Sequence, residues 1–347
     1  MNKRFKLDLM KRFVEVFIFL FLAVGLSAQS EQQLANYYKR NPDADANGDG
    51  KLTREEARAH RQQRDPTRGD NLSSTSAIPP IEIPLSVAPL KTVALKSQDG
   101  VILDFAYRTP KGKGPFPVII FFHGGGGMSN LEGLKRNLQN GAIQTRFLEK
   151  GFMTVQSTRR PYWPSRDKKQ PTGFADAVKD ASLVVEAVRG LPQVDADRII
   201  LYGGSGGGIL AIRTAAEVEV SHVVAGEPAT VVALDPRDGK PGGSAAYRDV
   251  MEKPENFYTK ERRKEMRGWM QEITAPVLVL QGNHTGLYKT NFEILIPEMK
   301  KLGKEISFIE FPGLSHGFYW GTTRTGATVA TVDKVVADVE EFIKGGE

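Results

Sequence analysis

The sequence predicts an α/β fold with a doubly wound, mostly parallel β-sheet, preceded by a small helical module. Between residues 90 and 347, apolar runs of strand length alternate with longer segments of helical pattern, as expected when helices cover both faces of a parallel sheet. Residues 118–122 are apolar throughout, as in strands buried on both faces. In the stretch ILYGGSGGGIL, residues 200–210, a strand passes into a helix through a serine set among glycines.

Local patterns define the elements of this domain. Asp99-Gly100 marks a tight turn between two strand-like runs. The last helix carries its apolar residues on one face, at positions 329, 332, 335, 336, 339, 342 and 343. We expect strands at residues 93–96, 101–108, 118–122, 152–156, 199–202, 222–225, 277–281 and 306–311. We expect helices at residues 131–150, 174–189, 206–217, 292–302 and 329–343.

The first 28 residues have the layout of a secretory signal peptide. Basic side chains precede an apolar run of 11 residues, 16–26, which ends in the small residues Ser27 and Ala28. This run is shorter than the roughly 20 residues that a membrane-spanning helix needs. We therefore expect a mature chain that starts near Gln29, is secreted or periplasmic, and is not stably inserted in a membrane. Glu15 and the long basic stretch leave an uncleaved anchor as the alternative.

The charge balance gives no argument for nucleic-acid binding. The chain has 47 Lys and Arg against 41 Asp and Glu, a net charge of +6. Residues 1–28 carry five basic and two acidic side chains, so an excess of only +3 remains without them. Because the chain has no cysteine, disulfides and thiolate metal sites are excluded.

Residues 29–64 are predicted to form a calcium-binding module. In DANGDGKLTREE, residues 45–56, oxygen-bearing side chains recur at the spacing of a calcium loop, and Gly50 stands at the sharp turn. With helices expected at 31–39 and 54–63, the module resembles a single EF-hand. Its expected ligands are Asp45, Asn47, Asp49, the carbonyl of Lys51, Thr53 and Glu56. The alternative is a solvated loop without an ion.

A tether is predicted between this module and the larger domain. Residues 65–89 are rich in Ser, Thr and Pro, which favour an extended chain over packed helix. We place the domain boundary there and assign the α/β domain to residues 90–347. Within it, residues 229–272 are expected to form a small cap over the site.

The turn around Ser205 fits the pattern G-x-S-x-G of a nucleophile elbow, in which small neighbours allow a strained turn that exposes the serine hydroxyl. A phosphate-binding loop is the competing interpretation, but no Lys-Ser or Lys-Thr pair follows the glycines. Upstream, HGGGG at residues 123–127 ends a strand with backbone N–H groups that can face an oxyanion, and we expect His123 to be structural. Downstream, His316 follows the last strand, so a base comes after the serine in chain order.

Residues 90–345 resemble the α/β-hydrolase superfamily, in particular its dienelactone hydrolase and prolyl-oligopeptidase-like branch. The resemblance rests on FPVIIFFHGGGG, VDADRIILYGGSGGG and SHGF in that order, and on the additional Gly208 after the elbow. It implies that Ser205 is the nucleophile and His316 the general base, with no cofactor for catalysis. It also implies an oxyanion hole made by backbone N–H groups of Gly206 and of Gly124 or Gly125.

The usual acid of the catalytic triad is missing from its expected loop. Most members of this superfamily carry it after the next-to-last strand, where this chain has GNHT with Thr285 at the matching position. Glu227 is the first candidate, because it directly follows the neighbouring strand and some members supply the acid there. Asn283 is the second, since an amide can also orient an imidazole, as in Cys-His-Asn proteases. The remaining candidates are Asp235 and Glu293.

Aromatic and basic residues in loops near the sheet edge suggest a substrate pocket for a sugar or an anionic group. They can equally pack the loops in which they lie. The candidates are Arg159, Arg160, Tyr162, Trp163 and Trp320.

These observations predict a secreted serine hydrolase that cleaves carboxylic esters through an acyl-enzyme. The expected substrate is a small molecule or an acylated carbohydrate. The alternatives are a serine peptidase of the oligopeptidase-like type and a non-catalytic binding protein that kept the fold and lost the acid.

Overall fold

A computed structural model describes residues 38–39, 41–53, 56, 59–60, 90–125, 131–160, 173–235, 243–322 and 325–345, without the side chains of 243–246 and 284. The chain divides into two compact units, Met1–Thr75 and Ser76–Glu347. This division falls within the predicted tether. The signal segment and the tether itself lie outside the described residues.

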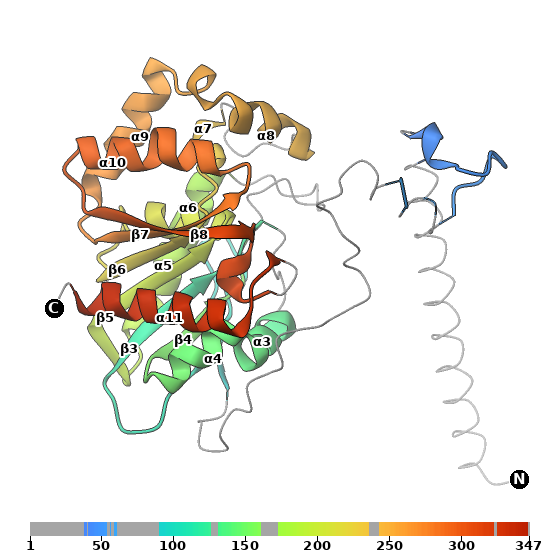
Figure 1. Ribbon diagram of the computed structural model, residues 1–347. Helices are drawn as coiled ribbons and strands as arrows, with labels where there is room; N and C mark the ends of the chain where they lie inside the picture. Colours follow the sequence, from blue (N-terminus) through green and yellow to red (C-terminus); the bar gives the residue numbers. More distant parts are fainter. Residues whose placement is uncertain are drawn as a thin grey trace, which may run out of the picture. The chain divides into compact units, whose positions relative to one another are not determined.

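The second unit is built on one eight-stranded sheet in the order β1-β2-β4-β3-β5-β6-β7-β8 (Figure 1). The pairs β1–β2 and β2–β4 are antiparallel, and every pair from β4 through β8 is parallel. The predicted mostly parallel α/β sheet is therefore confirmed. The strands are β1 (Lys91–Val93), β2 (Phe105–Arg108), β3 (Phe116–Phe122), β4 (Met153–Ser157), β5 (Val194–Gly204), β6 (His222–Gly226), β7 (Val277–His284) and β8 (Ile306–Ser315).

Helices cover both faces of the sheet, and no described helix is long and apolar enough to cross a membrane. Short 3₁₀ turns are η1 (Pro42–Ala44), η2 (Pro254–Asn256) and η4 (Phe318–Trp320), and η3 (Thr290–Leu295) is π-helical. The α-helices are α3 (Leu131–Asn140), α4 (Ala142–Glu149), α5 (Phe174–Arg189), α6 (Gly206–Thr214), α7 (Val231–Leu234), α8 (Gly243–Glu252), α9 (Lys260–Glu272), α10 (Ile296–Lys301) and α11 (Val329–Lys344).

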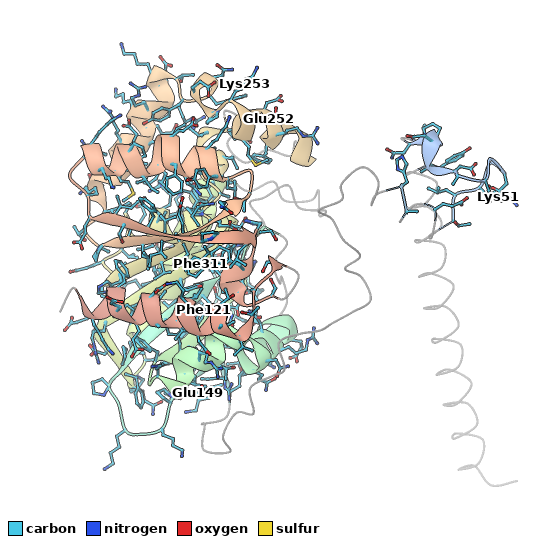
Figure 2. The ribbon with its side chains drawn as sticks, in the orientation of Figure 1. Lys51, Phe121, Glu149, Glu252, Lys253 and Phe311 are labelled. Carbon is cyan, nitrogen blue, oxygen red and sulfur yellow. The ribbon has the colours of Figure 1, made fainter. Side chains whose placement is uncertain are left out.

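Alternation along the central strands divides the core into two layers. Val118, Ile120 and Phe122 of β3 belong to a cluster with buried residues of α5, α6, α9 and α10. Ile119 and Phe121 belong to a second cluster with α4 and α11. Figure 2 shows Phe121 and Phe311 among the side chains of this second layer, between the sheet and α11. The two clusters thus pack on opposite faces of the central strands.

Two helices differ from their predicted form. The helix expected at 131–150 is interrupted at Gly141, where a Cβ atom would lie 2.1 Å from Oε1 of Gln144 and 2.5 Å from the carbonyl oxygen of Asn137. The helix expected at 292–302 starts earlier, as the π-helical η3, before continuing as α10. Hydrophobic periodicity alone does not distinguish a π-helical turn from an α-helical one.

Arg160, three residues beyond β4, joins parts of the fold, which is the second of the two roles that the sequence left open for it. Its side chain is 7% exposed, and its guanidinium donates to both carboxylate oxygens of Asp180 on α5. It also donates to Asp99 in the turn before β2, at 2.9 and 3.1 Å. These hydrogen bonds raise the pKa of Arg160. The clamp joins helix to hairpin and leaves the guanidinium unavailable to a substrate.

Candidate active site

Ser205 lies at the turn from β5 into α6, in a backbone conformation that few non-glycine residues adopt. Its φ is 55° and its ψ is −121°. The turn needs glycine around it: a Cβ atom on Gly203 would lie 2.0 Å from the carbonyl oxygen of Gly207. One on Gly207 would lie 2.0 Å from that of Phe122. Backbone strain of this kind concentrates at functional sites, and the geometry is that of a nucleophile elbow.

The loop after β3 passes directly beside this serine, since a Cβ atom on Gly124 would lie 3.3 Å from Cβ of Ser205. Arg159 donates hydrogen bonds to the carbonyl oxygens of His123, at 2.8 Å, and Gly124, at 2.9 Å. In a trans peptide unit, the N–H bond points in the direction opposite to the C=O bond. The N–H groups of Gly124 and Gly125 therefore point away from Arg159, which suits an oxyanion hole.

His123 is an internal part of this loop. Its Nδ1 lies 2.9 Å from the carbonyl oxygen of Gly124. Burial, assisted by the positive charge of Arg159, lowers the pKa of His123 to about 3. The ring is therefore neutral at working pH, and Nδ1 carries the proton that the carbonyl oxygen accepts. This is the structural role expected for it.

His316 and Glu227 meet at the sheet edge. Nδ1 of His316 lies 2.7 Å from Oε2 of Glu227, whose side chain is fully buried while that of His316 is 44% exposed. Two backbone N–H groups also donate to the carboxylate, that of Gly282 to Oε1 at 3.1 Å and that of Gly317 to Oε2 at 3.2 Å. Glu227 has a φ of 44°, so its backbone is strained as well. The carboxylate is thus held by three donors in one position.

The other candidate acids have different surroundings. Oδ1 of Asn283 accepts a hydrogen bond from the N–H of Gly313 at 2.9 Å. Glu293 is exposed on η3, and Asp235 is buried where its carbonyl oxygen accepts from Arg262. Of the four candidates, Glu227 is the one that the structure brings to His316.

A buried polar network behind Glu227 was not anticipated from the sequence. Nε2 of Gln281 donates to the carbonyl oxygen of Gly282 and to the hydroxyl of Thr285, at 2.8 and 3.2 Å. Oε1 of Gln281 accepts from Asn291 at 2.9 Å, and Oδ1 of Asn291 accepts from Thr230 at 2.6 Å. Gln281, Asn291 and Thr230 are fully buried. The sequence signals for this network were Gln281 at the end of an apolar strand and Asn291 within a helical segment. Their pairing depends on the fold and could not be predicted from either segment alone.

Tyr319 is a second residue that the sequence did not single out. Its hydroxyl lies 3.4 Å from Nε2 of His316, and its side chain is 1% exposed. Burial raises its pKa well above the ordinary value, and the charge of Glu227 adds to the effect. The phenol therefore stays protonated. It does not act as a base toward the imidazole, and its hydroxyl lies within hydrogen-bond distance of Nε2.

Of the remaining predicted pocket residues, Arg159 and Trp320 are described, and neither borders the cavity at the elbow. Arg159 holds the loop of His123 and Gly124. The ring of Trp320 packs 5.3 Å from that of Tyr202 and lies against Gly204, beneath the elbow. Tyr162 and Trp163 lie outside the described residues. The cavity itself, of about 400 Å³, is bordered by Ser205 and His316 together with residues from the segment after β6, α8 and the loop after β7.

In the predicted calcium loop, the acidic side chains accept hydrogen bonds from groups of the loop itself. Asp45 accepts from the N–H groups of Gly48 and Gly50, and Asp49 accepts from that of Lys51. Glu56 accepts from the N–H groups of Asn47 and Thr53 and from the Thr53 hydroxyl. No three His, Asp or Glu side chains converge as a metal site in the described part of the chain. The oxygen donors suit a hard cation, but their side chains would have to reorient toward it.

Comparisons with known proteins bear on the fold of this chain. The family model BD-FAE matches residues 103–229, which include His123, Gly124, Ser205 and Glu227. The structure resembles brefeldin A esterase, a bacterial homologue of human hormone sensitive lipase, at 17% identity and a TM-score of 0.56 over 77% of this chain and 80% of that one. It resembles the esterase Est22 at 18% identity and a TM-score of 0.55 over 75% and 81% of the two chains.

A larger protein shares the same fold. It is a proposed dipeptidyl aminopeptidase IV from Bacteroides ovatus ATCC 8483, with 18% identity and a TM-score of 0.55 over 74% of this chain. The match spans only 36% of that protein. No curated protein sequence matches. The sheet is thus an α/β-hydrolase fold, shared with esterases and peptidases.

Arg159→Met should lower kcat by about 10-fold to 100-fold with little change in KM, because the oxyanion loop loses the hydrogen bonds to its carbonyl oxygens. Outright removal of an oxyanion donor lowers kcat by about 10²–10³. Steady-state kinetics on a chromogenic ester, with the unfolding midpoint measured in parallel, checks this. Arg136→Met, at an exposed position on α3, is the control. A raised KM with unchanged kcat would instead make Arg159 a substrate-binding residue.

Proposed function

We propose that the protein is a serine hydrolase that cleaves carboxylic esters through an acyl-enzyme. The observation that carries the proposal is the 2.7 Å contact between Glu227 and Nδ1 of His316, with His316 and the strained Ser205 bordering the same cavity. A nucleophile, a base and a group that orients the base are the parts that acyl transfer requires.

In the first half-reaction, Oγ of Ser205 attacks the ester carbonyl carbon while its proton passes to Nε2 of His316. The developing oxyanion accepts hydrogen bonds from the N–H of Gly206 and from that of Gly124 or Gly125. The tetrahedral intermediate then collapses, the C–O bond to the alcohol breaks, and the alcohol leaves with the proton from Nε2. Ser205 is left as an ester of the acyl group.

In the second half-reaction, water replaces the alcohol. His316 takes a proton from the water as its oxygen attacks the acyl-enzyme, and the proton returns to Oγ of Ser205 as the carboxylic acid leaves. Glu227 keeps the proton of neutral His316 on Nδ1, so that Nε2 carries no proton and can act as base, and it stabilises the imidazolium. The N–H groups of Gly282 and Gly317 fix the carboxylate for this task.

A fluorophosphonate probe should label the purified chain at Ser205, and Ser205→Ala should abolish labelling and ester turnover. Glu227→Gln should lower kcat by about 10⁴, the loss found for the corresponding change in serine proteases. Asn283→Ala, which removes an amide that contacts Gly313 and not His316, is the matched control and should leave kcat within about twofold.

Each alternative has its own signature in these measurements. Absence of labelling would contradict the proposal and favour a non-catalytic binding protein. Labelling with cleavage of peptide amides in preference to matched esters would favour a peptidase. Normal turnover in Glu227→Gln would remove Glu227 from the mechanism.

We also propose export and calcium binding, both supported by the sequence. The signal-like segment, residues 1–28, lies outside the described residues. The calcium proposal rests on the oxygen pattern from Asp45 to Glu56 and on the positive φ of Gly50, 79°, at the turn position.

Calcium should bind the chelator-treated chain with a Kd of about 10⁻⁴–10⁻³ M, the range of extracellular modules. Isothermal titration calorimetry measures it directly. Glu56→Gln should weaken binding at least tenfold, because this position supplies both carboxylate oxygens. Glu55→Gln, one residue away and outside the ligand pattern, should bind as the wild type does. No saturable binding in the millimolar range would contradict the proposal.

A further inference from the structure

The cavity beside Ser205 has a mostly apolar lining. Ala229 and Val231 border it from the segment after β6, Tyr247 and Met251 from α8, and Leu287 from the loop after β7. Its polar border consists of the catalytic pair with Thr285 and Ser315. At about 400 Å³ it is near the lower end of ligand pockets, which span about 300–1,000 Å³. Such a chamber suits a compact apolar group.

The described lining offers nothing to a charged group. It includes no Lys, Arg, Asp or Glu, and Arg159 and Arg160, which follow β4, are engaged by other groups of the protein. A carboxylate or ammonium placed there would lose its hydration without gaining an opposite charge. The chamber therefore selects against charged substituents.

The exposure of His316 indicates which side of the ester enters the chamber. The alcohol must leave with a proton from this ring, and the ring is 44% exposed. Departure toward solvent therefore runs past His316, and the acyl group is left on the side of Ser205 that the apolar residues line. We propose that this protein selects esters whose acyl group is compact, uncharged and apolar and is held in this chamber, while a bulky alcohol faces solvent. This proposal rests on the ester hydrolase function proposed above.

Met251 and Gly286 set the length of the chamber. Both border it, and a Cβ atom on Gly286 would lie 2.9 Å from Sδ of Met251. The methyl group of an alanine at position 286 would therefore either displace the Met251 thioether or project into the chamber and shorten it. Shortening Met251 opens the same end.

The test is kcat/KM of the purified full chain for p-nitrophenyl acetate, butyrate, hexanoate and octanoate, each normalised to its hydroxide-catalysed rate. We expect a rise of about fourfold per added methylene until the chamber is full, from the free energy of burying one CH₂, and then a fall. Met251→Ala should move the optimum to a longer acyl chain and Gly286→Ala to a shorter one. Glu252→Ala, exposed on the same helix, should leave the profile unchanged.

A parallel series varies the alcohol of acetate esters and should show little dependence on alcohol length. A flat acyl profile that neither variant shifts would overturn the inference while leaving the hydrolase intact. A rise with alcohol length and not with acyl length would overturn it too, by assigning the chamber to the alcohol. If fluorophosphonate does not label Ser205 and no ester is cleaved, the proposed function itself fails, and the inference fails with it.

Discussion

The contact between Glu227 and His316 depends on the register of the parallel strands that end at one edge of the sheet. Gly204 of β5 pairs with Gly226 of β6, so Ser205 and Glu227 are the next residues on adjacent strands. They are also the two non-glycine residues with positive φ in the described part of the chain. The N–H of Ser205 donates to the carbonyl oxygen of Gly226, and that of Glu227 to the carbonyl oxygen of Leu280 on β7, both at 2.8 Å. Hydrogen bonds across neighbouring strands thus hold both strained turns in place.

Glycines at the ends of these strands make room for the segment that carries the histidine. A Cβ atom on Gly204 or Gly226 would lie 2.2 or 2.3 Å from the ring of Tyr319. The hydroxyl of Tyr202 donates to the carbonyl oxygen of Tyr319 at 2.7 Å, from within the same aromatic layer. Because Tyr319 is three residues from His316, its packing limits where the imidazole can lie. The glycines around the elbow therefore serve both the turn at Ser205 and the placement of His316.

Much of this arrangement could be predicted from local patterns. Alternating strands and helices indicated the sheet, the G-x-S-x-G turn marked Ser205, and the position of Glu227 one residue beyond β6 made it the first candidate for the acid. Local patterns do not show which side chains from distant segments contact each other. Arg159 and Arg160 are neighbours in sequence, yet Arg159 holds the loop of His123 and Gly124, and Arg160 joins α5 to the turn at Asp99. Gln281 and Asn291 acquire their role only when β7 and η3 pack together.

The central claim is that Glu227 orients the ring of His316, and the tautomer of that ring tests it most directly. Nitrogen-15 NMR of histidine-labelled protein, assigned with His316→Gln, reports which ring nitrogen carries the proton when the ring is neutral. If Glu227 orients the ring, neutral His316 is protonated on Nδ1 in the wild type and loses this preference in Glu227→Gln. A ring protonated on Nε2 in the wild type, or a tautomer that Glu227→Gln leaves unchanged, would contradict the claim.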